Sequence, residues 1–372
     1  MDHAKLTSPP DRDASFAAES DYGTMYNIIF GHSVAQMARC AALFSFADHL
    51  AHGSATAEKI AEAEGLDADA TFRLMRACAA FGLMTYDKNT GFSATPLLNT
   101  LRKDDPRSLR ALAVAQGGRG HWGPWGQFSE AIKTGEPQAN AALGSSVWEY
   151  YATPAGAEEA EAFSQAVGGL TGAFMLEAAP LIDTRSVGFA VDVGGATGSL
   201  IHALMKENPS LHGAVLDLPR VAADATKAAE ALGLQDRLLV IGGDFLVEIP
   251  SADLYLMKHI LHDWADEACI SILRNCRRAI KPNGRIVLIE IAMDEINPSP
   301  YVTQIDLTMM VVLGAKERTL EQYKALLIAA GFRFTRITAT STPFSLIEAV
   351  AASDKDLAGI AKPVRLPECV KT

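Results

Sequence analysis

The sequence has little of what marks several classes of protein. Its 33 lysines and arginines are outnumbered by 44 acidic residues, which gives a net charge of −11. Nucleic acids and anionic membranes bind clustered cationic side chains, so this balance argues against either partner. The five cysteines are scattered without C-x-x-C spacing, which indicates neither a disulfide framework nor a zinc site and favours small core residues. No apolar run approaches the ~18 residues of a membrane-spanning helix, and Met1–Ser20 lacks the apolar stretch of a signal peptide, so we expect a cytoplasmic protein.

What is present is enough apolar sequence for a large core. The chain has 372 residues, 49% of them hydrophobic, and two main domains are expected. Its patterns predict five segments: a flexible arm (1–20), a first domain (21–115), a helical linker (116–180), an α/β domain (181–352) and a tail (353–372). Residues 21–50 are helical and carry surplus apolar surface, which indicates a second copy of the chain as partner.

The first domain has the order of elements of a winged helix. Thr56 is the candidate cap of one helix, Asp69 or Thr71 opens the next, and residues 86–93 predict a hairpin. A DNA-binding regulator is therefore an alternative from a different functional class. Against it, the basic and acidic side chains of residues 54–103 cancel, and a recognition helix with only Arg73 and Arg76 would bind phosphates poorly.

Strand and helix patterns alternate from Phe189 onward. Strands are expected at 189–194, 213–218, 237–242, 252–258 and 285–292, and helices end near 207, 232, 280 and 330. Two last strands, 332–338 and 344–350, should form an antiparallel hairpin. This is a doubly wound, Rossmann-like sheet, whose ligand lies outside the carboxyl ends of the strands.

A glycine turn follows the first of these strands. The dinucleotide pattern G-x-G-x-x-G fails because Ala196 and Ser199 stand where it needs glycine. Asp217, at the end of the next strand, can accept hydrogen bonds from both ribose hydroxyls of an adenosine. An adenosyl ligand without phosphates is the economical interpretation, and a turn that only connects strand and helix is the structural alternative.

Further polar residues stand at the other strand ends. Asp244 and Phe245 suit an adenine ring, and His262 could act as a base at neutral pH, although such a histidine is more often structural. Glu290 and Glu317 could each orient the imidazole. His259 and His262 could form a metal pair, but no third ligand is evident, so we expect no metal.

Aromatic side chains are concentrated between the two predicted domains. They favour an interdomain core, with a pocket for a flat aromatic ligand as the sharper alternative. The residues are Trp122, Trp125, Trp148, Phe163 and Phe174.

Four motifs occur in order along the chain: Val191–Gly198, Gly243–Phe245, Tyr255–Trp264 and Gly314–Thr319. Together they resemble those of the S-adenosylmethionine-dependent small-molecule O-methyltransferases. This is the family of the plant caffeic acid enzymes, acetylserotonin methyltransferase and bacterial natural-product tailoring enzymes. The resemblance spans residues 25–350. It implies an N-terminal winged-helix dimerisation domain, a homodimer whose partner helps close the pocket, and S-adenosylhomocysteine as product.

The resemblance also assigns roles to individual positions. The catalytic base would be His262, with Glu290 and Glu317 beside it. The residues implied to hold S-adenosylmethionine are Gly194, Asp217, Asp244, Phe245 and Lys258. Those implied to line the acceptor pocket are Phe163, Asp263, Asp306, Met309 and Met310, of which the two methionines could equally be core.

Two positions depart from the family pattern: Ala196 replaces a glycine, and Val167 stands where methionine is common. The expected acceptor is a planar phenolic compound such as a secondary metabolite. The main alternative is a member of the same family with non-methylating or C-methylating chemistry.

Overall fold

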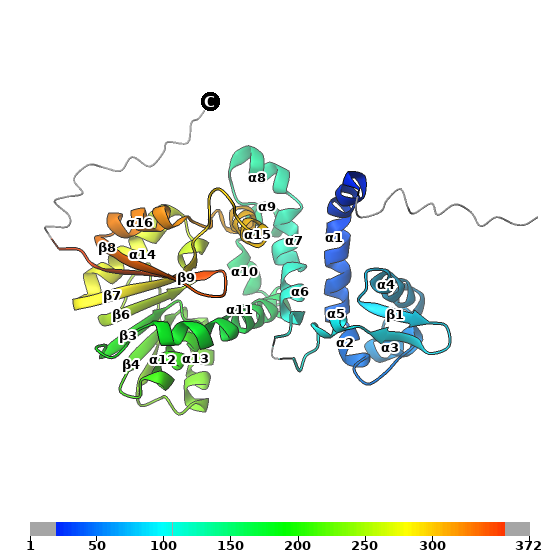
Figure 1. The fold of residues 1–372 in the computed structure, drawn as a ribbon, viewed down its shortest axis with the longest axis horizontal. Helices are drawn as coiled ribbons and strands as arrows, with labels where there is room; N and C mark the ends of the chain where they lie inside the picture. The colour runs from blue at the N-terminus through cyan, green and yellow to red at the C-terminus, as the bar shows by residue number, and fades with distance from the viewer. Residues whose placement is uncertain (1–19, 106, 354–372) are drawn as a thin grey trace, which may run out of the picture. The chain divides into compact units, whose positions relative to one another are not determined.

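The computed structural model describes residues 20–105 and 107–353, which form two compact units (Figure 1). The first unit contains residues 20–118 and 161–166, and the second contains residues 119–160 and 167–353. The predicted arm and tail lie outside the described residues, apart from Ser20 and Ser353.

The first unit is helical with one small hairpin. Its elements are α1 (Asp21–Leu43), α2 (Phe46–His49), α3 (Ala57–Glu64), α4 (Ala68–Ala80), β1 (Met84–Asp87), β2 (Gly91–Ala94), α5 (Pro96–Asn99) and α6 (Arg110–Gln116). Thr56 caps α3 as predicted, since its side chain accepts a hydrogen bond from the Lys59 amide at 3.3 Å. The prediction that Asp69 or Thr71 opens the next helix is wrong. Asp67 opens it, because its carboxylate accepts a hydrogen bond from the Ala70 amide at 2.8 Å.

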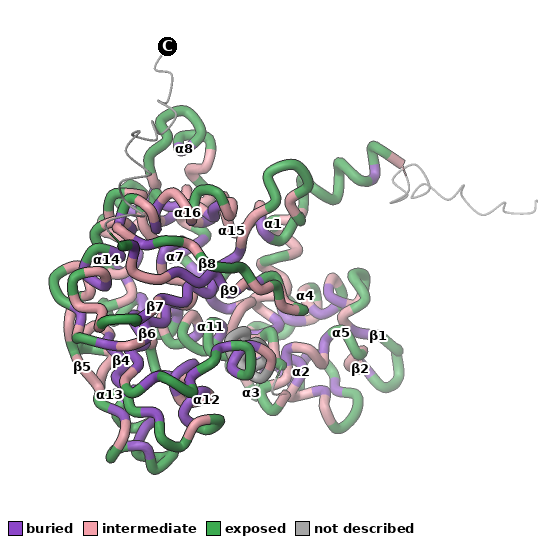
Figure 2. The backbone as a smooth tube through the Cα atoms, turned by 60° about the vertical axis from the view of Figure 1, so that its left-hand side comes forward, coloured by how far each residue is buried: buried purple, intermediate pink, exposed green. Residues whose placement is uncertain are grey.

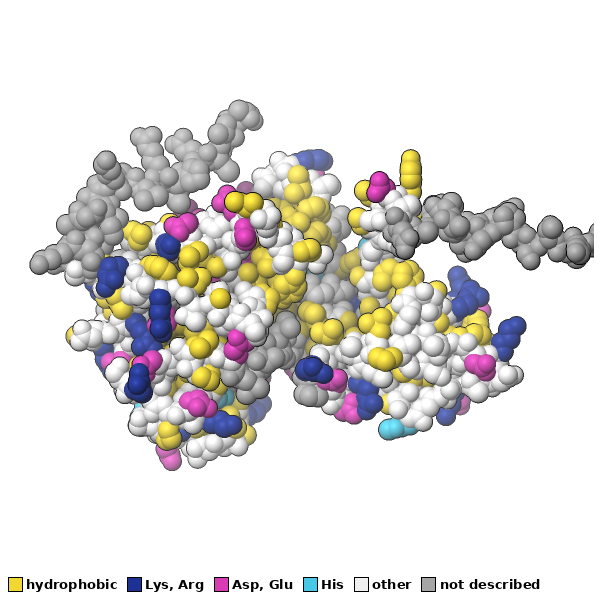
Figure 3. All heavy atoms as spheres, viewed as in Figure 1, with side chains coloured by type: hydrophobic (Ala, Val, Ile, Leu, Met, Phe, Trp, Pro, Cys, Tyr) yellow, Lys and Arg dark blue, Asp and Glu magenta, His cyan; other side chains and the backbone are white. Residues whose placement is uncertain are grey.

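The first turns of α1 carry apolar side chains that this unit leaves exposed. Ile28 is 66% exposed and Ile29 is 59% exposed, with four aromatic or methionine neighbours between Tyr22 and Phe30 similarly open. Figure 2 shows this end of α1 in the exposed colour, and Figure 3 shows hydrophobic side chains gathered there. Such a surface suits association with another protein chain.

The second unit begins with short helices. They are α7 (Arg119–Trp125), α8 (Phe128–Thr134), α9 (Ala139–Leu143) and α10 (Val147–Tyr151), followed by the long α11 (Ala157–Ala178) and a 3-10 turn at Ala179–Leu181. Trp125 and Trp148 pack in a cluster with a later π-helical turn, η4 (Met309–Leu313). Phe163 instead packs against the core of the first unit, and the side chain of Phe174 lies outside the described residues.

A seven-stranded sheet organises the rest of the second unit, in the order β5-β4-β3-β6-β7-β9-β8. The strands are β3 (Phe189–Val193), β4 (His212–Asp217), β5 (Leu238–Gly242), β6 (Ala252–Lys258), β7 (Ile280–Ile291), β8 (Phe332–Ala339) and β9 (Phe344–Ala351). The strands β3 to β7 pair in parallel, while β9 pairs antiparallel with both β7 and β8. The doubly wound sheet with an antiparallel final hairpin is confirmed.

Helices cover both faces of this sheet. On one face, α12 (Ser199–Glu207) and α13 (Pro219–Ala231) enclose one apolar core; on the other, α14 (Asp266–Ala279) and α16 (Leu320–Ala329) enclose a second (Figure 1). The central strands are buried on both sides (Figure 2), as a parallel sheet between helix layers requires. The sequence analysis did not predict α15 (Pro300–Thr308) or η4.

Within residues 20–105 and 107–353, no helix is long and apolar enough to cross a membrane. The cytoplasmic location stays a prediction.

Cys78, Cys269 and Cys276 are buried free thiols and Cys40 is half-buried, in agreement with their predicted place in the core; Cys369 lies outside the described residues.

Candidate active site

The glycine turn after β3 leaves bare backbone at the edge of the sheet. Gly194 has φ +68°, and a Cβ there would lie 2.4 Å from the Cδ1 atom of Ile260. Gly198 has φ +85°, which an L side chain rarely adopts. Ala196, between them, also has a positive φ of +49°. The turn therefore requires glycine at 194 and favours it at 198.

Carboxylates line the same edge. Asp217, at the end of β4, accepts hydrogen bonds from the Ala196 and Leu218 amides at 2.8 and 2.7 Å. Asp244 is exposed just past β5, where its carboxylate accepts from the Leu246 amide at 2.8 Å. Asp192, on β3, is buried, and its Oδ2 atom has no hydrogen-bond partner among the described residues. Burial raises the pKa of Asp192 to about 7.

An aromatic side chain and a half-buried ammonium complete the edge. The Phe245 ring meets Trp264 edge-on at 5.8 Å between centroids. Burial lowers the pKa of Lys258 to about 8, and its Nζ atom lies 5.2 Å from the Phe344 ring centroid. An adenosyl ligand with an amino-acid end fits this combination of a glycine turn, two carboxylates at the strand ends, the buried Asp192 and the ring of Phe245.

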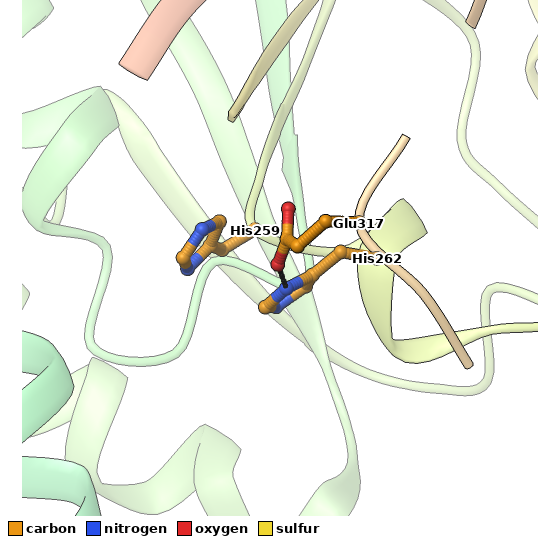
Figure 4. Close-up of side chains that lie close together, drawn as sticks. All are labelled: His259, His262 and Glu317. Carbon is orange, nitrogen blue, oxygen red and sulfur yellow. Dashed lines mark hydrogen bonds and ion pairs between the residues drawn. The ribbon is translucent and has the colours of Figure 1, made fainter. Parts of the chain in front are cut away.

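The side chain of His262 lies at the end of the neighbouring strand, in the 3-10 turn η3 (Leu261–Asp263) that follows β6. It is only 6% exposed. Its Nδ1 atom is 2.7 Å from the Glu317 carboxylate, and its Nε2 atom lies 3.2 Å from the Asp263 carboxylate (Figure 4 shows the first contact). The structure thus brings together two residues 55 positions apart that the sequence analysis assigned to one site.

The charge of this imidazole follows from its neighbours. Burial by itself would lower the pKa of His262, but the carboxylates of Asp263 and Glu317 outweigh it and raise the pKa to about 9. Burial also raises the pKa of Asp263 and, to about 7, that of Glu290. With the site free of other charges, His262 holds a proton at neutral pH.

Glu290, fully buried on β7, contacts the backbone of the turn that carries His262. Its Oε1 atom accepts hydrogen bonds from the Ile260 and Leu261 amides at 3.1 and 2.9 Å. Its Oε2 atom accepts one from the Tyr323 hydroxyl at 3.4 Å. Its observed contacts therefore hold the turn in place.

Of the predicted acceptor residues, Asp306 lies beside the base cluster. Its carboxylate accepts a hydrogen bond from the Glu317 amide at 2.9 Å. Met309 and Met310 are half-buried in η4, where Met310 packs against the aromatic cluster of the second unit. Phe163 belongs to the first unit, so its role at the acceptor stays a prediction.

Two histidines and one carboxylate lie close enough to suggest a metal centre. Potential ligand atoms of His259, His262 and Glu317 are all within 4.8 Å of one another, so a third donor exists that the sequence did not reveal (Figure 4). The two imidazoles are stacked, however, with centroids 3.9 Å apart and planes 20° apart. Because a nitrogen lone pair lies in the plane of its ring, rings stacked in this way cannot both direct one at the same ion. The distances fit a metal, but the directions do not.

Comparison with known proteins identifies the family of this chain. Residues 125–333 match the family model of an O-methyltransferase domain, and residues 26–104 match an O-methyltransferase dimerisation domain. The chain belongs to the O-methyltransferase family. The match to a dimerisation domain indicates a homodimer.

Individual relatives of this O-methyltransferase agree over nearly the whole chain. The phenazine O-methyltransferase of Lysobacter antibioticus is 32% identical, over 87% of this chain and 95% of its own. The structure of mitomycin 7-O-methyltransferase superposes with a TM-score of 0.85 at 32% identity, covering 91% of this chain and 99% of that one. An O-methyltransferase from neocarzinostatin biosynthesis, solved with S-adenosyl-L-homocysteine and 1,4-dihydroxy-2-naphthoic acid, has a TM-score of 0.76 at 31% identity, with 86% and 96% covered.

The sequence analysis missed one residue of the site. Arg318, next to Glu317, is fully buried and hydrogen-bonded to the backbone around His262. A signal was available, because Arg318 directly follows the predicted site carboxylate of Glu317, and an arginine buried there requires a partner.

Proposed function

We propose that this O-methyltransferase transfers the methyl group of S-adenosylmethionine to a phenolic hydroxyl of a small aromatic metabolite, with His262 as the general base. The observation that carries the assignment of the base is the imidazole of His262, whose Nδ1 faces the buried carboxylate of Glu317 beside the ligand edge of the sheet. Relatives named for phenazine and mitomycin, and the naphthoic acid bound by the neocarzinostatin enzyme, support an aromatic acceptor.

The cofactor would be held by the residues at the strand ends. Asp217 would accept its ribose hydroxyls, Asp244 and Phe245 would bind the adenine, and Gly194 and Lys258 would lie along the rest of the ligand. When bound, S-adenosylmethionine supplies a methyl group on a positively charged sulfur, which an oxygen nucleophile can attack.

His262 would remove the proton of the acceptor hydroxyl. A phenol has a pKa near 10, so only about one molecule in a thousand is ionised at pH 7. Once His262 has released its own proton, the neutral imidazole accepts that of the acceptor at Nε2, the atom that now lies 3.2 Å from Asp263, so the acceptor hydroxyl has to take the place of this carboxylate. Glu317 holds the proton on Nδ1, which fixes the tautomer and stabilises the imidazolium that forms.

The same geometry favours O-methyl transfer over a non-methylating reaction. A reaction without proton removal would have no use for a buried imidazole whose Nδ1 is already paired with a carboxylate. Asp306, Met309 and Met310 are proposed to shape the acceptor pocket, and we propose that the acceptor is a planar phenol.

The test is His262→Gln, which keeps a polar side chain of similar reach but cannot take up a proton. We expect the variant to bind S-adenosylhomocysteine with unchanged affinity in calorimetry. Methyl transfer to a phenolic acceptor, followed by mass spectrometry, should fall by about a hundredfold or more. Turnover equal to that of the wild type would rule out His262 as the base.

A further inference from the structure

Arg318 is the largest fully buried side chain of the described chain, with 0% of it exposed. A guanidinium is always charged, and burying it is costly unless its N–H groups are paired. The reaction proposed above does not use this charge. Its position therefore calls for another explanation.

The guanidinium is bonded to the turn that carries His262. Its Nη1 donates to the carbonyl of Leu261 at 2.7 Å, and its Nη2 donates to the carbonyl of Trp264 at 2.7 Å. These carbonyls belong to the residue just before His262 and to the residue two places after it. The planar fork of arginine can reach both at once, which a lysine ammonium cannot do in the same geometry.

A carboxylate holds the guanidinium from the other side. Asp266 accepts hydrogen bonds from Nε at 3.0 Å and from Nη2 at 2.7 Å through one oxygen. Asp266 opens α14, so the helix that packs on the sheet anchors the fork. Lys316 pairs with the other oxygen of the same carboxylate at 2.9 Å, but it is far more exposed.

The turn is thus held from two directions. Glu290 accepts from the amides of Ile260 and Leu261, while Arg318 donates to the carbonyl of Leu261. Because Arg318 follows Glu317 by one peptide bond, whatever fixes Arg318 against the turn also fixes the Glu317 carboxylate against the imidazole.

We propose that Arg318 is a positioning residue, which locks the His262 turn against the Glu317 segment and so sets the contact between base and carboxylate. This inference rests on the proposed role of His262. It assigns a function to the arginine of the Gly314–Thr319 motif.

Arg318→Lys keeps the charge but cannot bridge both carbonyls. We expect kcat for methyl transfer to fall by up to about a hundredfold, since small misplacements of a reacting group have effects of that size. The KM for the acceptor and the affinity for S-adenosylhomocysteine should change little. The control is Lys316→Met, which removes a positive charge from the same carboxylate without touching the turn and should leave kcat near the wild-type value.

A second measurement does not depend on activity. The groups facing His262 are Asp263 on its own turn, Glu317, Glu290 on β7 and the stacked His259. If Arg318→Lys loosens the Glu317 contact, the pKa of His262 should fall, which NMR titration of the imidazole in the cofactor-free homodimer would record; His262→Gln supplies the assignment. Arg318→Ala with added guanidinium, at concentrations far below those that unfold proteins, should regain part of the lost rate, and sodium chloride should not.

The outcomes separate this inference from the proposed function. If Arg318→Lys lowers the melting temperature but leaves kcat and the pKa of His262 unchanged, Arg318 is only structural and the inference is wrong. An equal loss in Lys316→Met would also overturn it, because charge on Asp266 would then be the cause. Should His262→Gln retain full turnover, the base assignment fails, whereas the titration still reports whether Arg318 holds the imidazole.

Discussion

Two parts of the same sheet edge are built in opposite ways. The cofactor edge, formed by the glycine turn, Asp217 and Asp244, is only partly buried and relies on backbone and on two carboxylates, of which Asp217 is half-buried and Asp244 exposed. The base cluster around His262 is buried, and both of its ring nitrogens face carboxylates. The cofactor edge therefore needs a ligand to complete its contacts, whereas the contacts of the base cluster are already formed within the protein.

The difference follows from what each part has to do. A ligand with many polar groups brings its own hydrogen-bonding partners, so the open edge needs only acceptors and bare backbone near the right places. A base must be aligned to within fractions of an ångström, which requires that its partners are present before the substrate arrives. Substitutions in the cluster should therefore affect the chemical step, and those at the edge should affect binding.

Among the changes that test this comparison with His262 itself kept, the largest effect is expected for Glu317→Gln. The substitution keeps a hydrogen-bond acceptor near Nδ1 but removes the charge that stabilises the imidazolium, so the maximal rate should fall by about ten- to a hundredfold. Since the carboxylates raise the pKa of His262 to about 9, the rate of the wild type should rise with pH up to that region. In the variant the pKa falls, and the plateau should be reached at lower pH.

The measurement is kcat/KM against pH for both proteins with one acceptor. Ionisation of the acceptor is common to the two curves, so a displacement between them belongs to the enzyme. Curves with the same midpoint would show that Glu317 does not set the pKa of the base.

A smaller effect, confined to binding, is expected for Asp217→Ala. A hydrogen bond to a charged group contributes about 1.5–3 kcal/mol, so each ribose hydroxyl that loses its bond should weaken S-adenosylhomocysteine binding by roughly ten- to a hundredfold. At saturating cofactor, kcat should stay within about threefold, because the base cluster is untouched.

Calorimetry and steady-state kinetics would separate the two quantities. Asp224→Asn is the matched control, because this exposed carboxylate on α13 pairs only with Lys227, at 3.0 Å, among the contacts seen in the described chain. If Asp217→Ala lowered kcat as strongly as affinity, the division between edge and cluster would not hold.

The fold was predictable where the signals are local. The strand β6 was expected at 252–258 and is found at Ala252–Lys258, and the helix expected to end near 280 is α14, which ends at Ala279, because apolar patterns act over a few residues. The turn η4 was not predicted. Its backbone is held by a distant segment, with the Gln138 amide donating to the Val311 carbonyl at 2.7 Å, and no local pattern reports such a contact.

The residues that belong to the site were predictable, but the atoms that they contact were not. His262 and Glu317 were assigned together, and the structure brings them into contact. Glu290 accepts hydrogen bonds from backbone amides, and the Asp306 carboxylate accepts one from the Glu317 amide. These contacts depend on how the chain turns after β6, where His259 has a φ of +52°. Nothing in the residue types selects a backbone partner over a ring nitrogen.

The smallest effect is expected at the cofactor edge itself, for Ala196→Gly. With φ at +49°, Ala196 carries a left-handed strain of roughly 1–2 kcal/mol, whereas glycine loses roughly 0.5–1 kcal/mol of extra chain freedom on folding. The net gain in the free energy of unfolding should therefore lie between roughly zero and 1.5 kcal/mol, measured by urea denaturation. Ala223→Gly makes the same change on the exposed side of α13, where the helical backbone favours alanine, and should lose about 1 kcal/mol instead. A gain in stability at 196 together with a loss at 223 would show that the turn of the cofactor edge holds backbone strain; a loss at both positions would contradict it.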